Sequence, residues 1–190
     1  FEEVISENIK KDVKRHFPDD RDSKELEMRR ALEKLAFTFE YQGKNNGTWK
    51  EIQQTLSKNE QHIIKCAGSL LDGSEGGDST WKYNHNNIQE YLVAKLLSKQ
   101  KFEVIKKVIC FPKAYKKVKP TWVNTLSFII SSLAESDEVR KQLLDWLSNN
   151  EPELLIKFEP DKLTDSIRYK VFEKIFNFYK KEKSRVNRSK

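Results

Sequence analysis

The chain has 190 residues, of which 37% are hydrophobic and 34% are charged, and its 36 basic and 29 acidic side chains give a net charge of +7. This length fits one or two small domains, and the composition allows only a thin hydrophobic core, as in helical-repeat proteins. No apolar run approaches the roughly 18 residues of a membrane-spanning helix and no signal peptide is present, so we expect a cytoplasmic protein that stays out of the membrane.

The first part of the sequence predicts two helices. Apolar residues at spacings of three and four indicate a helix over 1–17 whose buried stripe comprises Phe1, Val4, Ile5, Ile9 and Val13. A capping-box pattern at Asp22 and Glu25 begins a second helix, which runs to about Tyr41. Its predicted apolar stripe comprises Met28, Leu32, Leu35 and Phe39.

Two short helices and a hairpin are expected next. After a turn, Thr48 and Glu51 predict the cap of one helix, and a further helix is expected over 60–67. The predicted hairpin consists of a strand, a glycine-rich turn and a second strand, over 69–72, 73–78 and 79–84. Three helices followed by a hairpin form the layout of a winged helix, which we predict over 23–98.

From Asn87 onward the sequence again predicts helices. Asn86 or Asn87 can cap the first, which would bury Ile88, Tyr91, Leu92 and Leu96. Later helices are expected over 102–110, after Pro120, after a cap at Asp137, after Pro152, and after a cap at Thr164 or Asp165. The last one would bury Ile167, Val171, Ile175, Phe178 and Tyr179.

Successive amphipathic helices with short connections are typical of an α-solenoid. The predicted fold class is therefore mainly α, with a winged-helix domain that carries a small β-hairpin and a HEAT-like helical array over 99–190.

Cysteine content and charge distribution add two expectations. Cys66 and Cys110 lie far apart in apolar surroundings, which indicates buried, reduced thiols. Nine lysines and one acid lie between Lys95 and Lys119, and six basic residues and one acid lie between Lys180 and Lys190. Such runs suit an anionic partner such as nucleic acid. Because solvated helix faces carry similar clusters, nucleic-acid binding through Lys95–Lys119 is not favoured and stays an alternative.

Motifs for self-contained catalysis are absent from the sequence. It holds no phosphate-binding loop and no H-E-x-x-H, C-x-x-C or G-x-S-x-G motif. The histidines His16, His62 and His85 fall in different predicted elements and indicate no metal site. We therefore expect no enzyme activity from these residues alone. His85 is the one polar candidate, since an imidazole between a strand and a helix can donate a hydrogen bond to a phosphate oxygen.

The segment 81–94 carries the most informative pattern, Trp-Lys-Tyr-Asn-His-Asn-Asn-Ile-Gln-Glu-Tyr-Leu-Val-Ala. Its form, aromatic-x-His-x-x-apolar-Gln-Glu-Tyr-Leu-x-Ala, resembles the segment that ends the winged-helix domain of NACHT-type STAND NTPases. Residues 1–5 look like the final helix of the domain that follows a NACHT core, so 1–22 is expected to end that domain. Less specific likenesses to the family are found at 32–37, 150–155 and 161–163.

The resemblance implies that His85 is a cofactor-binding residue. In the family, the corresponding His contacts the β-phosphate of bound ADP and holds the closed, inactive state, and ATP exchange accompanies opening and oligomerisation. The chain would thus be a regulatory and scaffolding fragment whose partner is its own upstream NTPase domain, in an ATP-dependent protein that resembles bacterial anti-phage sensors. Gln89, Glu90 and Tyr91 match the rest of the motif but are expected to belong to the helix start, with Gln89 donating a hydrogen bond to the Asn86 backbone and Tyr91 packing inward.

Two other functions fit the sequence. A DNA-binding winged helix would use a recognition helix over 60–67 and a wing over 73–78, but this helix offers only Lys65 as a cation and the wing carries Glu75 and Asp78, which repel phosphates. A helical protein-interaction module would instead expose the aromatic side chains of Trp146, Phe172 and Phe176 along its last helices. We expect these three side chains to form a second buried face.

Overall fold

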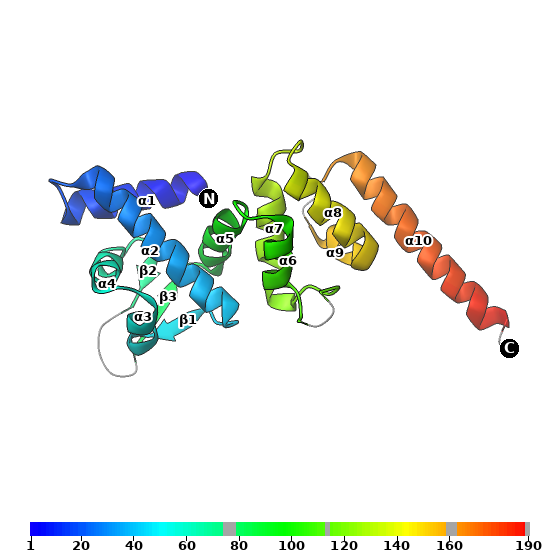
Figure 1. Cartoon of the computed structure of the whole chain (residues 1–190), viewed down its shortest axis with the longest axis horizontal. Helices are drawn as coiled ribbons and strands as arrows, with labels where there is room; N and C mark the ends of the chain where they lie inside the picture. The colour runs from blue at the N-terminus through cyan, green and yellow to red at the C-terminus, as the bar shows by residue number, and fades with distance from the viewer. Residues whose placement is uncertain (74–78, 113–114, 159–162, 189–190) are drawn as a thin grey trace. The chain divides into compact units, whose positions relative to one another are not determined.

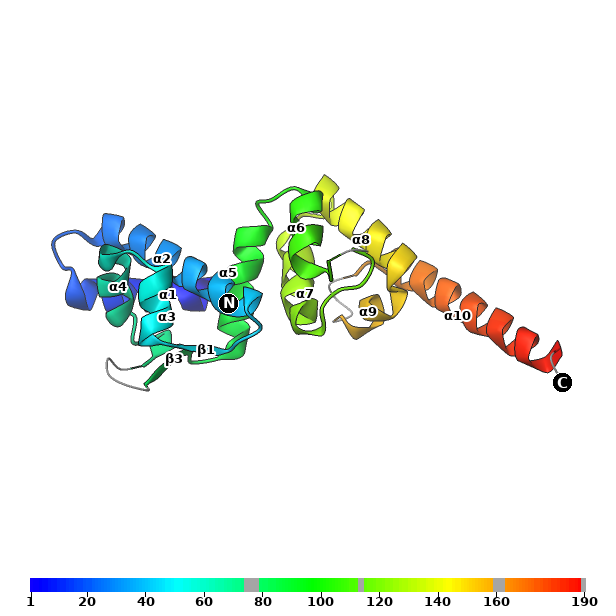
Figure 2. The same ribbon diagram turned by 60° about the horizontal axis from the view of Figure 1, so that its bottom comes forward.

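A computed structural model describes residues 1–73, 79–112, 115–158 and 163–188, and the side chains of 181–188 lie outside the description. The chain forms two compact units, 1–99 and 100–190. It is mainly helical with a small antiparallel sheet (Figures 1 and 2), so the predicted mainly-α class is confirmed. In the part of the chain that the structure describes, no helix has both the length and the apolarity needed to cross a bilayer.

The first unit is built around one long helix. Its helices are α1 (Glu2–His16), α2 (Arg21–Tyr41), α3 (Trp49–Thr55), α4 (Lys58–Lys65) and α5 (Asn86–Leu97). Helices α1, α4 and α5 all pack against α2, which Figure 1 shows running through the middle of the unit. The apolar stripe predicted for α2 is confirmed, because Met28, Leu32, Leu35 and Phe39 are all buried. At the start of α1, by contrast, Phe1 and Val4 are exposed rather than buried.

Side-chain caps begin two of the five helices described in the first unit, α3 and α4. The predicted box at Thr48 is confirmed, since its hydroxyl accepts from the Glu51 amide at 3.3 Å and its amide donates to the Glu51 carboxylate at 2.9 Å. A second box at Ser57 begins α4 at Lys58, earlier than predicted. The predicted cap at Asp22 is wrong: the last non-helical residue is Asp20, and Asp22 already lies in the first turn, where its charge suits the helix dipole.

The sheet has three strands rather than the two of the predicted hairpin. Strands β1 (Asn46–Thr48), β2 (Leu71–Asp72) and β3 (Thr80–Tyr83) are antiparallel in the order β1-β3-β2. Sequence patterns missed β1 because its three residues include an Asn-Gly pair that is typical of turns. Glycine is required there, since a Cβ on Gly47 would lie 2.5 Å from Cε1 of Phe39. Most of the predicted turn over 73–78 lies outside the described residues.

The second unit contains α6 (Phe102–Ile109), a 3₁₀ turn η1 (Pro120–Trp122), α7 (Val123–Ser132), α8 (Glu138–Asn150), α9 (Pro152–Lys157) and α10 (Asp165–Arg188). Asp137 caps α8 as predicted, accepting from the Val139 amide at 2.8 Å. The core of the unit includes Ile105, Trp122, Leu126, Ile129, Leu143 and Leu147.

Helix α10 buries much less than its sequence predicts. Val171 is 2% exposed, but Phe178 and Tyr179 are 58% and 59% exposed. The second buried face expected for this helix is also wrong, because Phe172 and Phe176 are 63% and 56% exposed. Its neighbour α9 has six residues and is therefore about 9 Å long, which covers fewer than two turns of α10.

A buried carboxyl on α2 makes the stability of the first unit depend on pH. Glu33 is 9% exposed, and burial raises its pKa above the ordinary value, against the opposing charges of Lys99 and Arg29. The folded state therefore holds this proton more tightly than the unfolded state. Its contribution favours folding at low pH and is lost as the pH rises through the raised pKa.

Glu33→Gln should consequently raise the melting temperature at about pH 7 and leave it nearly unchanged at about pH 3, where the parent carboxyl is protonated. Thermal unfolding monitored by circular dichroism at both pH values measures this difference. Glu7→Gln, at an exposed position on α1, is the control for the loss of one negative charge. An equal effect of Glu33→Gln at the two pH values would contradict the assignment.

Candidate functional site

His85 lies at the junction between the sheet and the next helix. Tyr83 ends β3, Asn86 begins α5, and His85 is the N-cap with extended backbone angles of φ −139° and ψ 136°. Its side chain makes no capping hydrogen bond and is exposed. The predicted caps Asn86 and Asn87 are both inside the helix, because the chain turns helical one residue earlier than expected. The imidazole is thus presented to solvent at the positive end of a helix dipole.

The backbone just before His85 is anchored to the loop that enters β2. The Asn84 amide donates to the Leu70 carbonyl at 3.0 Å, and the Asn84 side chain donates to the Ser69 carbonyl at 3.1 Å. Asp12 on α1 binds the other side of the same loop, accepting from the Ser69 amide at 2.9 Å and from the Ser69 hydroxyl at 2.8 Å. Since Asp12 is 5% exposed, this carboxylate acts from inside the unit.

A second anchor holds the first turn of α5. Gln89 is 2% exposed, and its amide nitrogen donates to the Glu40 carboxylate at 2.8 Å and to the Lys44 carbonyl at 3.0 Å. The predicted return bond from Gln89 to the Asn86 backbone is therefore wrong. Gln89 falls on the buried side of the helix together with Ile88, so it reaches the end of α2 instead of its own helix start.

The middle of α5 is joined to α1 and α2 by a polar network around Glu2. Arg29 donates to one oxygen of this carboxylate at 2.8 Å, Tyr91 donates to the other at 3.2 Å, and Lys95 lies 3.9 Å away. Burial alone would raise the pKa of Glu2, but Arg29, Tyr91 and the other partners lower it overall. Burial, followed by the nearby Glu2 charge, raises the pKa of Tyr91 to about 12. Tyr91 is thus half-buried in a network rather than packed in an apolar interior.

Sequence reasoning singled out His85 but missed the residues that fix it. Asp12 and Glu40 lie on the buried faces of α1 and α2. An acidic residue at a buried position of an amphipathic helix is therefore the sequence feature that could have identified them. Neither forms part of a metal site, and the described parts of the chain hold no group of three or more His, Cys, Asp or Glu side chains that could bind a metal ion. The cysteines are free thiols; Cys110 is buried as predicted, whereas Cys66 is partly exposed.

Side chains of the alternative DNA-binding site are engaged in contacts within the chain, which does not favour that alternative. Lys65 on α4 places its ammonium group 4.8 Å from the centre of the Trp49 ring, so part of its charge is directed to an aromatic face. Glu75 and Asp78 of the predicted wing lie outside the described residues. Helix α4 begins with Lys58 and carries a paired acid, Glu60, whose carboxylate lies 3.1 Å from Lys34.

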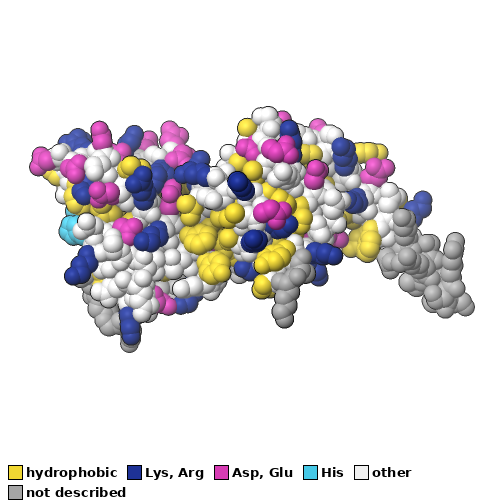
Figure 3. All heavy atoms as spheres, viewed as in Figure 1, with side chains coloured by type: hydrophobic (Ala, Val, Ile, Leu, Met, Phe, Trp, Pro, Cys, Tyr) yellow, Lys and Arg dark blue, Asp and Glu magenta, His cyan; other side chains and the backbone are white. Residues whose placement is uncertain are grey.

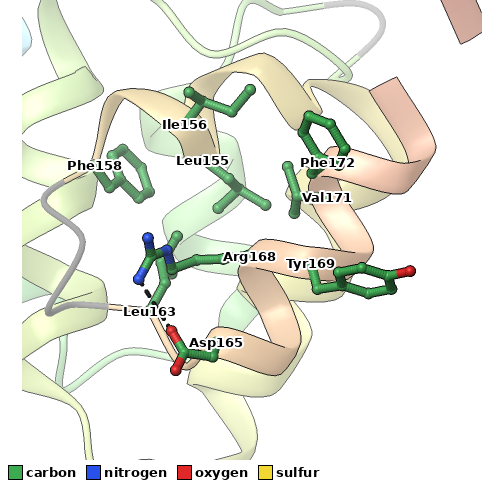
Figure 4. Close-up of a pocket in the computed structure, with 9 residues that line it drawn as sticks. All are labelled: Leu155, Ile156, Phe158, Leu163, Asp165, Arg168, Tyr169, Val171 and Phe172. Atoms are coloured by element: carbon green, nitrogen blue, oxygen red, sulfur yellow. Dashed lines mark hydrogen bonds and ion pairs between the residues drawn. The ribbon is translucent and has the colours of Figure 1, made fainter. Parts of the chain in front are cut away.

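An apolar pocket of about 460 Å³ lies between α9 and α10 in the second unit (Figure 4). Its walls include Leu155 and Val171, while Figure 4 shows the Tyr169 ring pointing away. The only charged groups drawn there pair with each other, Arg168 and Asp165 at 3.0 Å. Trp146, the third aromatic residue considered for partner binding, is half-buried on α8. The protein-interaction alternative therefore rests on α9 and α10.

Comparison of the chain with protein-family models, with curated proteins and with solved structures gives no match.

Proposed function

We propose that this chain is the regulatory and scaffolding part of a NACHT-type STAND NTPase. In this proposal, 1–22 ends the domain that follows the NTPase core, 23–98 is the winged-helix domain, and 99–190 is a HEAT-like array that relays sensing. His85 contacts the β-phosphate of ADP bound by the separate NTPase domain and thereby helps to hold the inactive state. The observation that carries the proposal is the exposed imidazole of His85 on a backbone that hydrogen bonds hold on both sides, those of Asn84 before it and those of the buried Gln89 after it.

The position of His85 suits an anion for two physical reasons. An imidazole N–H donates a hydrogen bond, and such a bond to a charged oxygen contributes about 1.5–3 kcal/mol. The N-terminus of α5 adds a partial positive charge, which favours a phosphate near the first turn. Asn84 and Gln89 hold the backbone on either side of His85, so little backbone freedom is lost when His85 contacts the nucleotide.

The remaining parts of the proposal also rest on the resemblance to this family. ATP exchange would break the contact with His85, and the cytoplasmic protein would then open and form a homo-oligomer. We propose bacterial anti-phage defence as its biological setting.

Histidine footprinting tests whether His85 meets the nucleotide. In the isolated chain, diethyl pyrocarbonate should modify His85 as readily as His16 and His62, because all three side chains are exposed. In the full-length protein with ADP, His85 alone should be protected, and ATP should restore its reactivity. Mass spectrometry of the modified peptides gives the three rates together, so His16 and His62 are internal controls. Equal reactivity of His85 with ADP and with ATP would contradict the proposed contact.

A further inference from the structure

Between α6 and η1, residues 110–111 and 117–118 pair as a narrow two-stranded ribbon. Cys110 and Val118 make an antiparallel β-bridge. The next pair continues it, since the Phe111 amide donates to the Lys117 carbonyl at 3.0 Å. The base of the ribbon is fixed to the rest of the second unit, because the Val118 amide donates to the Glu151 carboxylate at 2.5 Å.

Alternation along the ribbon places an aromatic ring and a cation on the same outer face. Cys110 and Val118 are 1% and 5% exposed, so their side chains point into the unit. Successive side chains of an extended segment point to opposite sides, and Phe111 and Lys117 therefore both point outward. Phe111 is 50% exposed and Lys117 is also exposed. Figure 3 shows hydrophobic side chains beside Lys and Arg side chains on this part of the unit.

The backbone is strained at Tyr115, two residues before Lys117 of the ribbon. Tyr115 has a φ of +46°, a left-handed conformation that costs a non-glycine residue about 1–2 kcal/mol. Strain of this kind persists where the surrounding structure enforces it, and it is concentrated at functional loops. Lys116 and Lys117, which follow Tyr115, are both exposed. No acidic residue occurs between Cys110 and Lys119, and the acid that contacts this segment, Glu151, lies at its base with its carboxylate on the Val118 amide.

We propose that this ribbon surface, defined by Phe111 and Lys117 with the exposed Lys116 beside them, binds single-stranded nucleic acid. An unpaired base stacks on the Phe111 ring, and the lysines contact the flanking phosphates. Stacking on an aromatic side chain accepts any base, whereas the bases of a duplex are already stacked on each other. The surface therefore selects single strands over duplexes without reading sequence. This proposal stands independently of the nucleotide contact at His85.

Fluorescence anisotropy with a labelled oligothymidine of about 12 nucleotides, within the site size of comparable binding surfaces, tests the proposal on the whole chain. Phe111→Ala should weaken binding about 5- to 100-fold, the range expected for the loss of one stacked base. Lys117→Gln should weaken binding and reduce the slope of log affinity against log salt by about 0.7, the value for one phosphate contact to a single strand. Phe111→Trp, which keeps an aromatic face, should retain binding.

Matched controls come from α10, which carries an exposed aromatic ring and an exposed cation away from the ribbon. Phe172→Ala and Lys170→Gln remove these groups and should bind the oligonucleotide as the parent does. Unchanged far-UV circular dichroism of each variant shows that the fold is kept. Equal affinity for a duplex of the same length, or undiminished binding by Phe111→Ala, would overturn the proposal. So would binding to phosphatidylserine vesicles without binding to the oligonucleotide.

Discussion

His85→Ala in the full-length protein is expected to release ADP about 10- to 100-fold faster and to raise basal activity. The proposed contact is a hydrogen bond from an imidazole to a charged phosphate oxygen, which contributes about 1.5–3 kcal/mol. Each 1.4 kcal/mol corresponds to about a tenfold change in affinity, and changes at an established interface are expressed mainly in the dissociation rate. Release of a fluorescent ADP analogue from the purified protein measures the effect.

Two histidine variants control for unspecific damage. His16→Ala and His62→Ala remove exposed imidazoles from α1 and α4 and should release ADP at the parent rate. His85→Ala should also melt at the parent temperature, because the His85 side chain makes no capping bond whose loss would weaken α5. An unchanged ADP dissociation rate in a folded His85→Ala protein would remove the basis of the proposed function.

Asp12→Ala is expected to have the largest effect on stability. Its buried carboxylate accepts hydrogen bonds from both the amide and the hydroxyl of Ser69, and its removal leaves these two half-buried donors without their acceptor. We expect a cost of about 2–4 kcal/mol, which corresponds to a fall of about 10–25 °C in the melting temperature of a unit of this size. Differential scanning calorimetry measures the change, and Glu7→Ala on the exposed side of α1 should show almost none of it.

Hydrogen exchange locates the effect of Asp12→Ala. The Ser69 amide loses its acceptor directly, and the Asn84 amide and side chain both bind the loop of Ser69 and Leu70. Exchange at Ser69 and Asn84 should therefore accelerate more than exchange in α2. The variant should also release ADP faster than the parent in the full-length protein, because Asn84 no longer holds His85 as firmly. Uniform acceleration throughout the unit would contradict this local coupling.

Patterns of capping and apolar spacing were sufficient to predict most helices of the chain. Thr48 and Asp137 have side chains that satisfy the helix amides nearest to them, so the caps could be read from sequence. The apolar stripe of α2 was equally easy to predict, because helical periodicity alone places those residues on one face. The junction between β3 and α5 was placed to within one residue, since the helix begins at Asn86 with His85 as its N-cap.

Contacts between distant segments could not be predicted in this way. Strand β1 pairs with β3 across more than thirty residues, Gly47 opposite Trp81, and nothing in three residues specifies that pairing. Gln89 binds Glu40 on another helix, whereas sequence spacing suggested a local bond. The exposed aromatic face of α10 was missed because periodicity shows which residues share a face and not whether a neighbour covers it.

The proposed contact between His85 and the nucleotide would be visible in a structure of the full-length protein with ADP bound. We expect an imidazole nitrogen of His85 within hydrogen-bond distance, about 2.6–3.2 Å, of a phosphate oxygen. The hydrogen bonds from Asn84 to Ser69 and from Gln89 to Glu40 should be kept in that state. An ADP-bound structure in which His85 remains in solvent, far from the nucleotide, would disprove the contact and with it the proposed function.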